Sequence, residues 1–132
     1  MLRMGRSQND VDNASSGGLS TFFDINTGRL GDYAISYNSE LFSQHPDTQF
    51  VFSNQRISRW NDIRTYVTEL AGRFPFFTYL GWDIALTIKG PVAIEINRTP
   101  AADIMEKTSY GLREKFGIED PDYFWKNPGK RL

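Results

Sequence analysis

One stretch constrains the fold more tightly than any other, residues 81–100, GWDIALTIKGPVAIEINRTP. Its pattern predicts two short strands joined by a turn. Side chains alternate between the two faces of a strand, so the pairing register decides which residues share a face. A two-residue turn that contains Gly90 mixes apolar and charged side chains on both faces. A three-residue loop, 88–90, places Asp83 opposite Glu95 and makes both faces consistent.

This register gives the predicted hairpin one apolar and one polar face. The apolar face consists of Trp82, Ile84, Leu86, Val92, Ile94 and Ile96, and is expected to belong to the core. The opposite face carries Asp83, Glu95 and Asn97 at one end, beside Ala85 and Ala93. Because Pro91 has no N–H for the ladder, the loop can widen to 87–91 without changing this register.

The polar face of the hairpin has two interpretations. Two carboxylates directly opposite each other repel, by about 0.2–1 kcal/mol for a typical cross-strand pair, so a cation between them is expected. Asp, Glu and Asn offer only oxygen ligands, which Mg²⁺ or Mn²⁺ prefers. The alternative is that these side chains lie on the solvated face of a half-exposed sheet. The spacing alone leaves both interpretations open.

The rest of the chain predicts a small α+β fold. A hairpin with its turn near Gly28 is expected within residues 19–37, whereas residues 38–56 show no clear period. His45, in that polar stretch, is expected in a surface loop. Apolar residues at helical spacing predict a helix over 58–73, and Thr99–Pro100 favours the start of a second, over 100–115. We therefore expect an antiparallel sheet with helices packed on one face.

Composition excludes several classes of protein. The chain has 132 residues, which fits one domain, and its formal net charge of −1 gives no reason to expect a nucleic-acid partner. Cysteine is absent, so there is no disulfide or thiolate site, and the cytoplasm is the expected location. No apolar run approaches the ~20 residues that a membrane-spanning helix needs, so no membrane partner is expected.

Several motifs together resemble the sugar-transfer associated ATP-grasp family. The pattern of Asp83 followed by Glu95-x-Asn97 resembles the metal-binding end of ATP-grasp enzymes. The text around it, LRMGRSQNDVDNASSGGLSTFFDINTGRL and LGWDIALTIKGPVAIEINRTPAADIMEKT, is similar to this particular family over about residues 2–115. The resemblance implies that these three side chains hold Mg²⁺ between the β- and γ-phosphates of ATP.

The resemblance also implies roles for other residues. A short strand is expected over residues 1–6. Arg3, Arg6 and Arg98 are candidates for binding the γ-phosphate or a substrate carboxylate, with Asn13 in the loop after this strand. Backbone N–H groups around Gly17 and Gly18 could contact phosphate. For the arginines the alternative is a solvated side chain, and for the glycines it is an ordinary turn.

On this resemblance, residues 1–116 are expected to form the C-terminal subdomain of an ATP-grasp module and 117–132 a tail. The N-terminal nucleotide-binding subdomain is expected to be absent, so it stays open whether the chain is an enzyme. A nucleotide and a carboxylate substrate are the expected partners if an N-terminal lobe completes the cleft. The family implies activation of a carboxylate substrate as an acylphosphate, which an amine or another nucleophile attacks. The alternative is a non-catalytic remnant or interaction module that forms a homo-oligomer through the surface exposed by the missing lobe.

Overall fold

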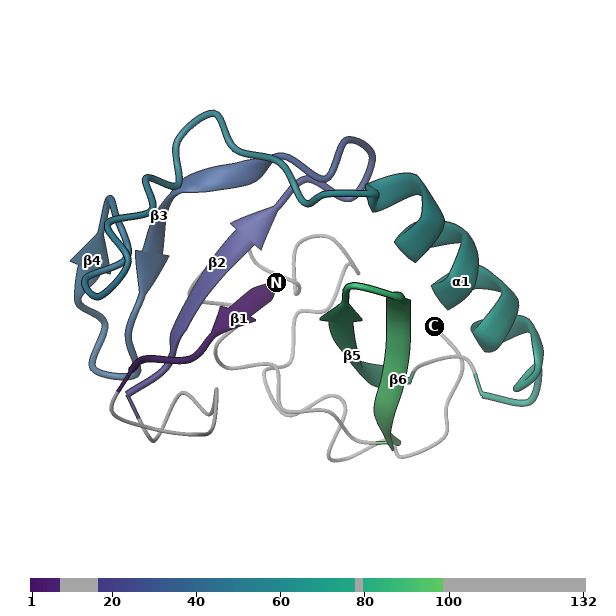
Figure 1. Ribbon diagram of the computed structural model, residues 1–132. Coiled ribbons are helices and arrows are strands. Elements are labelled where there is room, and N and C mark those ends of the chain that lie inside the picture. The colour runs from purple at the N-terminus through teal and green to yellow at the C-terminus, as the bar shows by residue number, and fades with distance from the viewer. Residues whose placement is uncertain (8–16, 78–79, 99–132) are drawn as a thin grey trace, which may run out of the picture. The chain divides into compact units, whose positions relative to one another are not determined.

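The computed structural model describes residues 1–7, 17–77 and 80–98 (Figure 1). Antiparallel strands and one helix among these residues confirm the α+β class. The strands form a four-stranded and a two-stranded sheet, where a single sheet was predicted. The second predicted helix, 100–115, and the tail 117–132 lie outside the described residues.

The chain divides into two compact units, one containing Met1–Ser58 and the other beginning at Arg59. The first unit holds the four-stranded sheet, and all of its neighbouring strands are antiparallel. In sheet order, its strands are β1 (Leu2–Met4), β2 (Leu19–Phe23), β3 (Leu30–Ile35) and β4 (Leu41–Phe42).

The connection between β2 and β3 confirms the predicted hairpin. Asp24 Oδ1 accepts hydrogen bonds from the backbone N–H groups of Asn26 and Thr27, at 3.0 and 2.7 Å. Gly28 follows with a φ of 71°, a conformation that residues with a side chain rarely adopt. The aspartate and the glycine therefore fix this turn, each by its own chemistry.

The core of the first unit combines sheet residues with an irregular segment. Its buried apolar side chains are Leu19, Leu30, Ala34, Phe52 and Ile57. Phe52 and Ile57 follow β4 in a stretch held by backbone hydrogen bonds, from Phe52 N to Ser43 O (3.2 Å) and from Ile57 N to Gly28 O (2.9 Å). This stretch contributes core side chains without forming a long strand or helix.

Thr21 is a buried polar residue of β2 and gives a first prediction. Its hydroxyl donates to the backbone oxygen of Tyr33 at 2.8 Å, where the register between β2 and β3 shifts. Replacing Thr21 with Val removes this donor, so the free energy of unfolding should fall by about 1 kcal/mol in urea denaturation. The control is Thr68→Val, whose exposed hydroxyl donates to Arg64 O at 2.8 Å. Equal losses in both variants would contradict the prediction.

The second unit begins with helix α1 (Trp60–Gly72), close to the predicted 58–73. Its N-cap is Arg59, in the left-handed conformation at φ 54° and without a side-chain cap. Ile63 is the buried residue of the predicted apolar stripe. The helix contacts the hairpin that follows it, where Tyr66 Oη accepts the backbone N–H of Ala93 at 3.1 Å.

That hairpin, β5 (Gly81–Thr87) and β6 (Gly90–Asn97), confirms one part of the predicted register and corrects another. Asp83 lies opposite Glu95, as predicted. Beyond this pair the register shifts by one residue, so the predicted three-residue loop is wrong. Thr87 pairs with Gly90 across a two-residue loop, and an additional residue in β6, Ile94, absorbs the difference.

The shift changes which residues share a face. Ala85 lies opposite Val92 and Ile84 opposite Ala93, so the pair of alanines expected beside the carboxylates does not form. The predicted apolar core face is also wrong. Four of its six members are exposed, Leu86 (47%), Val92 (48%), Ile94 (72%) and Ile96 (43%). Trp82 is half-buried and packs its ring edge-on against Phe74, at a centroid distance of 5.6 Å.

Candidate functional site

The three predicted metal ligands come together at one end of the β5–β6 hairpin. Asp83 and Glu95 are directly opposite, and Asn97 is two residues further along β6 on the same face. Opposite residues in an antiparallel pair have Cβ atoms about 4.5–5.5 Å apart, and diagonal neighbours about 7–8 Å. We name Asp83, Glu95 and Asn97 the metal corner. Asp83 and Asn97 are half-buried, whereas Glu95 is exposed.

The donor set of the metal corner fits a hard divalent cation. Two carboxylates and one amide oxygen supply oxygen ligands alone, the type that Mg²⁺ and Mn²⁺ prefer. Within the described ranges, no group of three or more His, Cys, Asp or Glu side chains could hold a metal. A metal here would therefore use the amide of Asn97 as a third protein ligand and fill its remaining positions with water or phosphate oxygens.

The predicted cationic and phosphate-binding residues lie in two places. Arg98 is exposed and follows the metal corner directly in the second unit. Arg3 pairs with Ser20 in the first unit, and Arg6 follows the same strand, β1. The pairing of Met4 with Leu19 brings the segment after β1 and the glycines before β2 to the same end of the sheet.

The two glycines differ in their surroundings. Gly17 is exposed and has a φ of 90°, whereas Gly18 is buried directly before β2. Asn13 lies outside the described residues. The structure thus brings the metal ligands together in one unit and places Arg3, Arg6 and the two glycines in the other.

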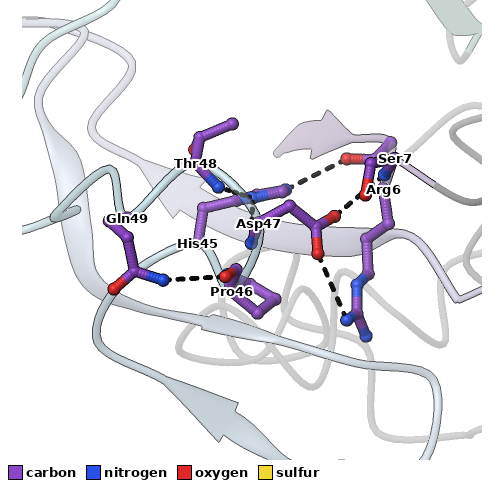
Figure 2. Close-up of polar contacts among 8 residues, drawn as sticks. Arg6, Ser7, His45, Pro46, Asp47, Thr48 and Gln49 are labelled. Atoms are coloured by element: carbon purple, nitrogen blue, oxygen red, sulfur yellow. Dashed lines mark hydrogen bonds and ion pairs between the residues drawn. The ribbon is translucent and has the colours of Figure 1, made fainter.

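The sequence did not predict the polar cluster around His45, which Figure 2 shows. The expectation of a surface position is wrong, because His45 is only 5% exposed. Its Nδ1 accepts the backbone N–H groups of Asp47 (3.3 Å) and Thr48 (3.4 Å). Nε2 therefore carries the proton and donates to the backbone oxygen of Gly5 at 3.0 Å. The signal in the sequence is the run His-Pro-Asp-Thr, a turn in which a histidine side chain can cap backbone N–H groups.

Asp47 completes this cluster and gives a pH prediction. The hydrogen bond from the Ser7 backbone N–H, at 2.8 Å, together with the Arg6 guanidinium, holds the pKa of Asp47 below its ordinary value of 3.8. A lowered pKa in the folded state means that the carboxylate stabilises the fold above pH 3.8 and loses this effect as the pH falls through the folded-state pKa. Asp47→Asn should therefore be less stable than the wild type at neutral pH, and the difference in the free energy of unfolding should shrink as the pH falls below 3.8.

Urea denaturation at a series of pH values from about 7 to about 3 measures this difference. A constant difference between the two proteins over the whole range would contradict the role of the Asp47 charge.

Comparison with known proteins identifies the family of the chain. A family model described as sugar-transfer associated ATP-grasp matches residues 1–116. The chain therefore belongs to the sugar-transfer associated ATP-grasp family, and this membership identifies it as an ATP-binding, ligase-like module. ATP-grasp proteins generally use ATP and Mg²⁺.

Two further comparisons gave no match, neither among curated proteins nor among solved structures. Among the described residues, no helix combines the length and the apolar character that crossing a bilayer requires.

Proposed function

We propose that residues 1–116 are the C-terminal part of an ATP-grasp catalytic module, which binds Mg-ATP and activates a carboxylate substrate as an acylphosphate. The observation that carries this proposal is the register of β5 and β6, which puts Asp83 opposite Glu95 with Asn97 on the same face. Two aligned carboxylates repel unless a cation lies between them, and an amide oxygen adds a neutral ligand. Membership of the ATP-grasp family indicates that the nucleotide is ATP.

In this function Asp83, Glu95 and Asn97 would hold Mg²⁺, or Mn²⁺, beside the phosphates of ATP. The bound ion would neutralise the charge that develops on the phosphates during transfer. Two carboxylates leave room for phosphate oxygens among the ligands, because Mg²⁺ in nucleotide sites is usually held by one or two carboxylates together with phosphates and water. Asn97 orients the ion without adding negative charge.

The reaction also needs cations and N–H donors around the phosphates. Arg3, Arg6 and Arg98 are proposed to bind the γ-phosphate or the substrate carboxylate, since a guanidinium matches the geometry of both anions. The segment of Asn13, Gly17 and Gly18 is proposed to contact the nucleotide through N–H groups. The positive φ of Gly17 supports this role, because it allows a backbone turn in which successive N–H groups can face an anion.

The proposed chemistry proceeds in two steps. A substrate carboxylate oxygen attacks the γ-phosphorus, the bond from that phosphorus to the β–γ bridging oxygen breaks, and ADP leaves with the electron pair. An amine or another nucleophile then attacks the acyl carbon and releases phosphate. Positioning and charge neutralisation supply most of the catalysis in such a transfer.

Calorimetric titration of Mg-ATP into the full chain tests this function, with variants of the metal corner as described in the Discussion. Saturable binding that requires Mg²⁺ is expected. Absence of binding would reject the proposed function and favour the alternative, a non-catalytic interaction module.

A further inference from the structure

A compact loop follows β4 and contacts the segment directly after β1. We name residues 44–51 the clasp loop, because a bridge between Gln44 and Val51 closes its base. Within it, His45 N donates to Phe50 O and Gln49 N to His45 O, each at 2.8 Å. Gln49 has a φ of 59°, so the chain reverses sharply there. These bonds give the loop a defined shape of its own.

The clasp loop holds the segment Gly5–Ser7 at three points (Figure 2). His45 Nε2 donates to Gly5 O at 3.0 Å, on one side of Arg6. Asp47 Oδ2 accepts the Ser7 N–H at 2.8 Å, on the other side. Asp47 Oδ1 accepts from Arg6 Nη2 at 3.4 Å. The backbone is thus fixed before and after Arg6, and the guanidinium is directed at the same time.

His45 connects the two halves of this arrangement. Its ring accepts the N–H of Asp47 on Nδ1 and donates to Gly5 on Nε2, so one buried side chain links the position of the Asp47 backbone to that of Gly5. Both ring nitrogens of His45 thus have partners. A buried polar group whose hydrogen bonds are all made favours one geometry of the groups around it.

We propose that Asp47 and His45 are positioning residues for Arg6, which they hold ready to bind an oxyanion of a polyphosphate. The anion-binding role of Arg6 rests on the proposed function. The contact with Asp47 uses one guanidinium nitrogen of a group with five N–H donors, and the Arg6 side chain is 39% exposed. Arg6 can therefore bind an anion while it stays bonded to Asp47. A side chain already held in place loses less conformational freedom on binding, which raises affinity.

Calorimetric titration of Mg-ATP into the full chain tests this role, with Asp47→Asn as the main variant. Binding should weaken about twofold to fivefold, the effect of losing one partly exposed charge pair. Asp47→Glu, which keeps the charge, should recover part of the affinity. The matched control is Asp62→Asn, because Asp62 is exposed and also pairs with an arginine, Arg59, at 2.8 Å. The control should bind as the wild type does.

A double-variant cycle separates positioning from a general effect on the fold. If Asp47 acts through Arg6, Asp47→Asn should have no further effect on affinity in an Arg6→Ala background. A loss that persists without Arg6 would overturn the proposal. So would unchanged binding by the single variant. Tighter binding would overturn it as well, since Asp47 would then compete with the anion for Arg6.

Failure of this inference can be told apart from failure of the proposed function. If Asp83→Asn abolishes binding while Asp47→Asn leaves it unchanged, the function stands and the positioning role is overturned. If the wild type does not bind Mg-ATP, the function fails, and NMR relaxation of the Arg6 Nε–H decides the positioning role. Lost order in Asp47→Asn and in His45→Gln would support it, whereas equal order in all three proteins would overturn it.

Discussion

Replacing Glu95 with Gln, or Asp83 with Asn, is expected to weaken Mg-ATP binding by at least about 100-fold. Each change removes one of the two charges that lie opposite each other at the end of the β5–β6 hairpin. Loss of a group that only supports a metal ligand typically costs about 10–100-fold in metal affinity, so loss of a ligand itself should cost more. Titration calorimetry with Mg-ATP measures the effect, and titration with ATP in EDTA shows how much of the binding needs the metal.

The stability of the Glu95→Gln variant distinguishes loss of a ligand from loss of structure. Glu95 is exposed, so its side chain contributes little to the packing of the hairpin. Glu95→Gln keeps the size of this side chain and should leave the free energy of unfolding of the metal-free protein within about 0.5 kcal/mol of the wild type. The affinity for Mg-ATP should therefore fall sharply, while the free energy of unfolding stays close to that of the wild type.

A matched control is available on the neighbouring helix. Glu69→Gln on α1 changes the same charge at another exposed position of the second unit and should leave Mg-ATP binding unchanged. Wild-type affinity in Glu95→Gln would contradict the metal corner. It would favour the other interpretation of the sequence, in which these side chains lie on a solvated face of the hairpin.

The pairing of Asp83 with Glu95 was predictable because alternation of polar and apolar residues places both on one face, and that pairing is confirmed. The register beyond it was not predictable from alternation, since an additional residue such as Ile94 shifts the pairing without changing the composition of either strand. The loop prediction failed for the same reason. Gly90, which was assigned to the loop, instead begins β6 with a φ of 132°.

The helix and the clasp loop show the same contrast between periodic and irregular sequence. Helix α1 was predictable because its apolar residues repeat at helical spacing. The sequence of the clasp loop shows no period, because the loop is not held by a regular backbone ladder. Side chains of His45 and Asp47 accept backbone N–H groups instead. Which side chain caps which backbone group depends on tertiary contacts, here with Gly5 and Ser7, and these are distant in sequence. The predicted core face of the hairpin failed likewise, since burial depends on what packs against a face.

Phe52 carries the second large prediction, because it anchors the base of the clasp loop in the core of the first unit. Its side chain is fully buried, and its ring packs edge-on against Phe50 at a centroid distance of 5.8 Å. Phe52→Ala should lower the free energy of unfolding by about 3–5 kcal/mol, through lost burial and the cavity that remains. Typical domains are stable by only about 5–15 kcal/mol, so much of the fold's stability would be lost.

The matched control is Phe50→Ala, which removes the same ring from a position that is 43% exposed. This variant should lose about 1 kcal/mol, close to the value of an aromatic pair. Urea denaturation compares the two variants, and hydrogen exchange of the Ser7 amide reports on the hydrogen bond to Asp47. Because the Phe52 ring is fully buried directly after the loop, its loss should expose the Ser7 amide far more than loss of the Phe50 ring does. Equal losses of stability in the two variants would show that the loop is not anchored through Phe52, and Arg6 would then owe its position to local contacts alone.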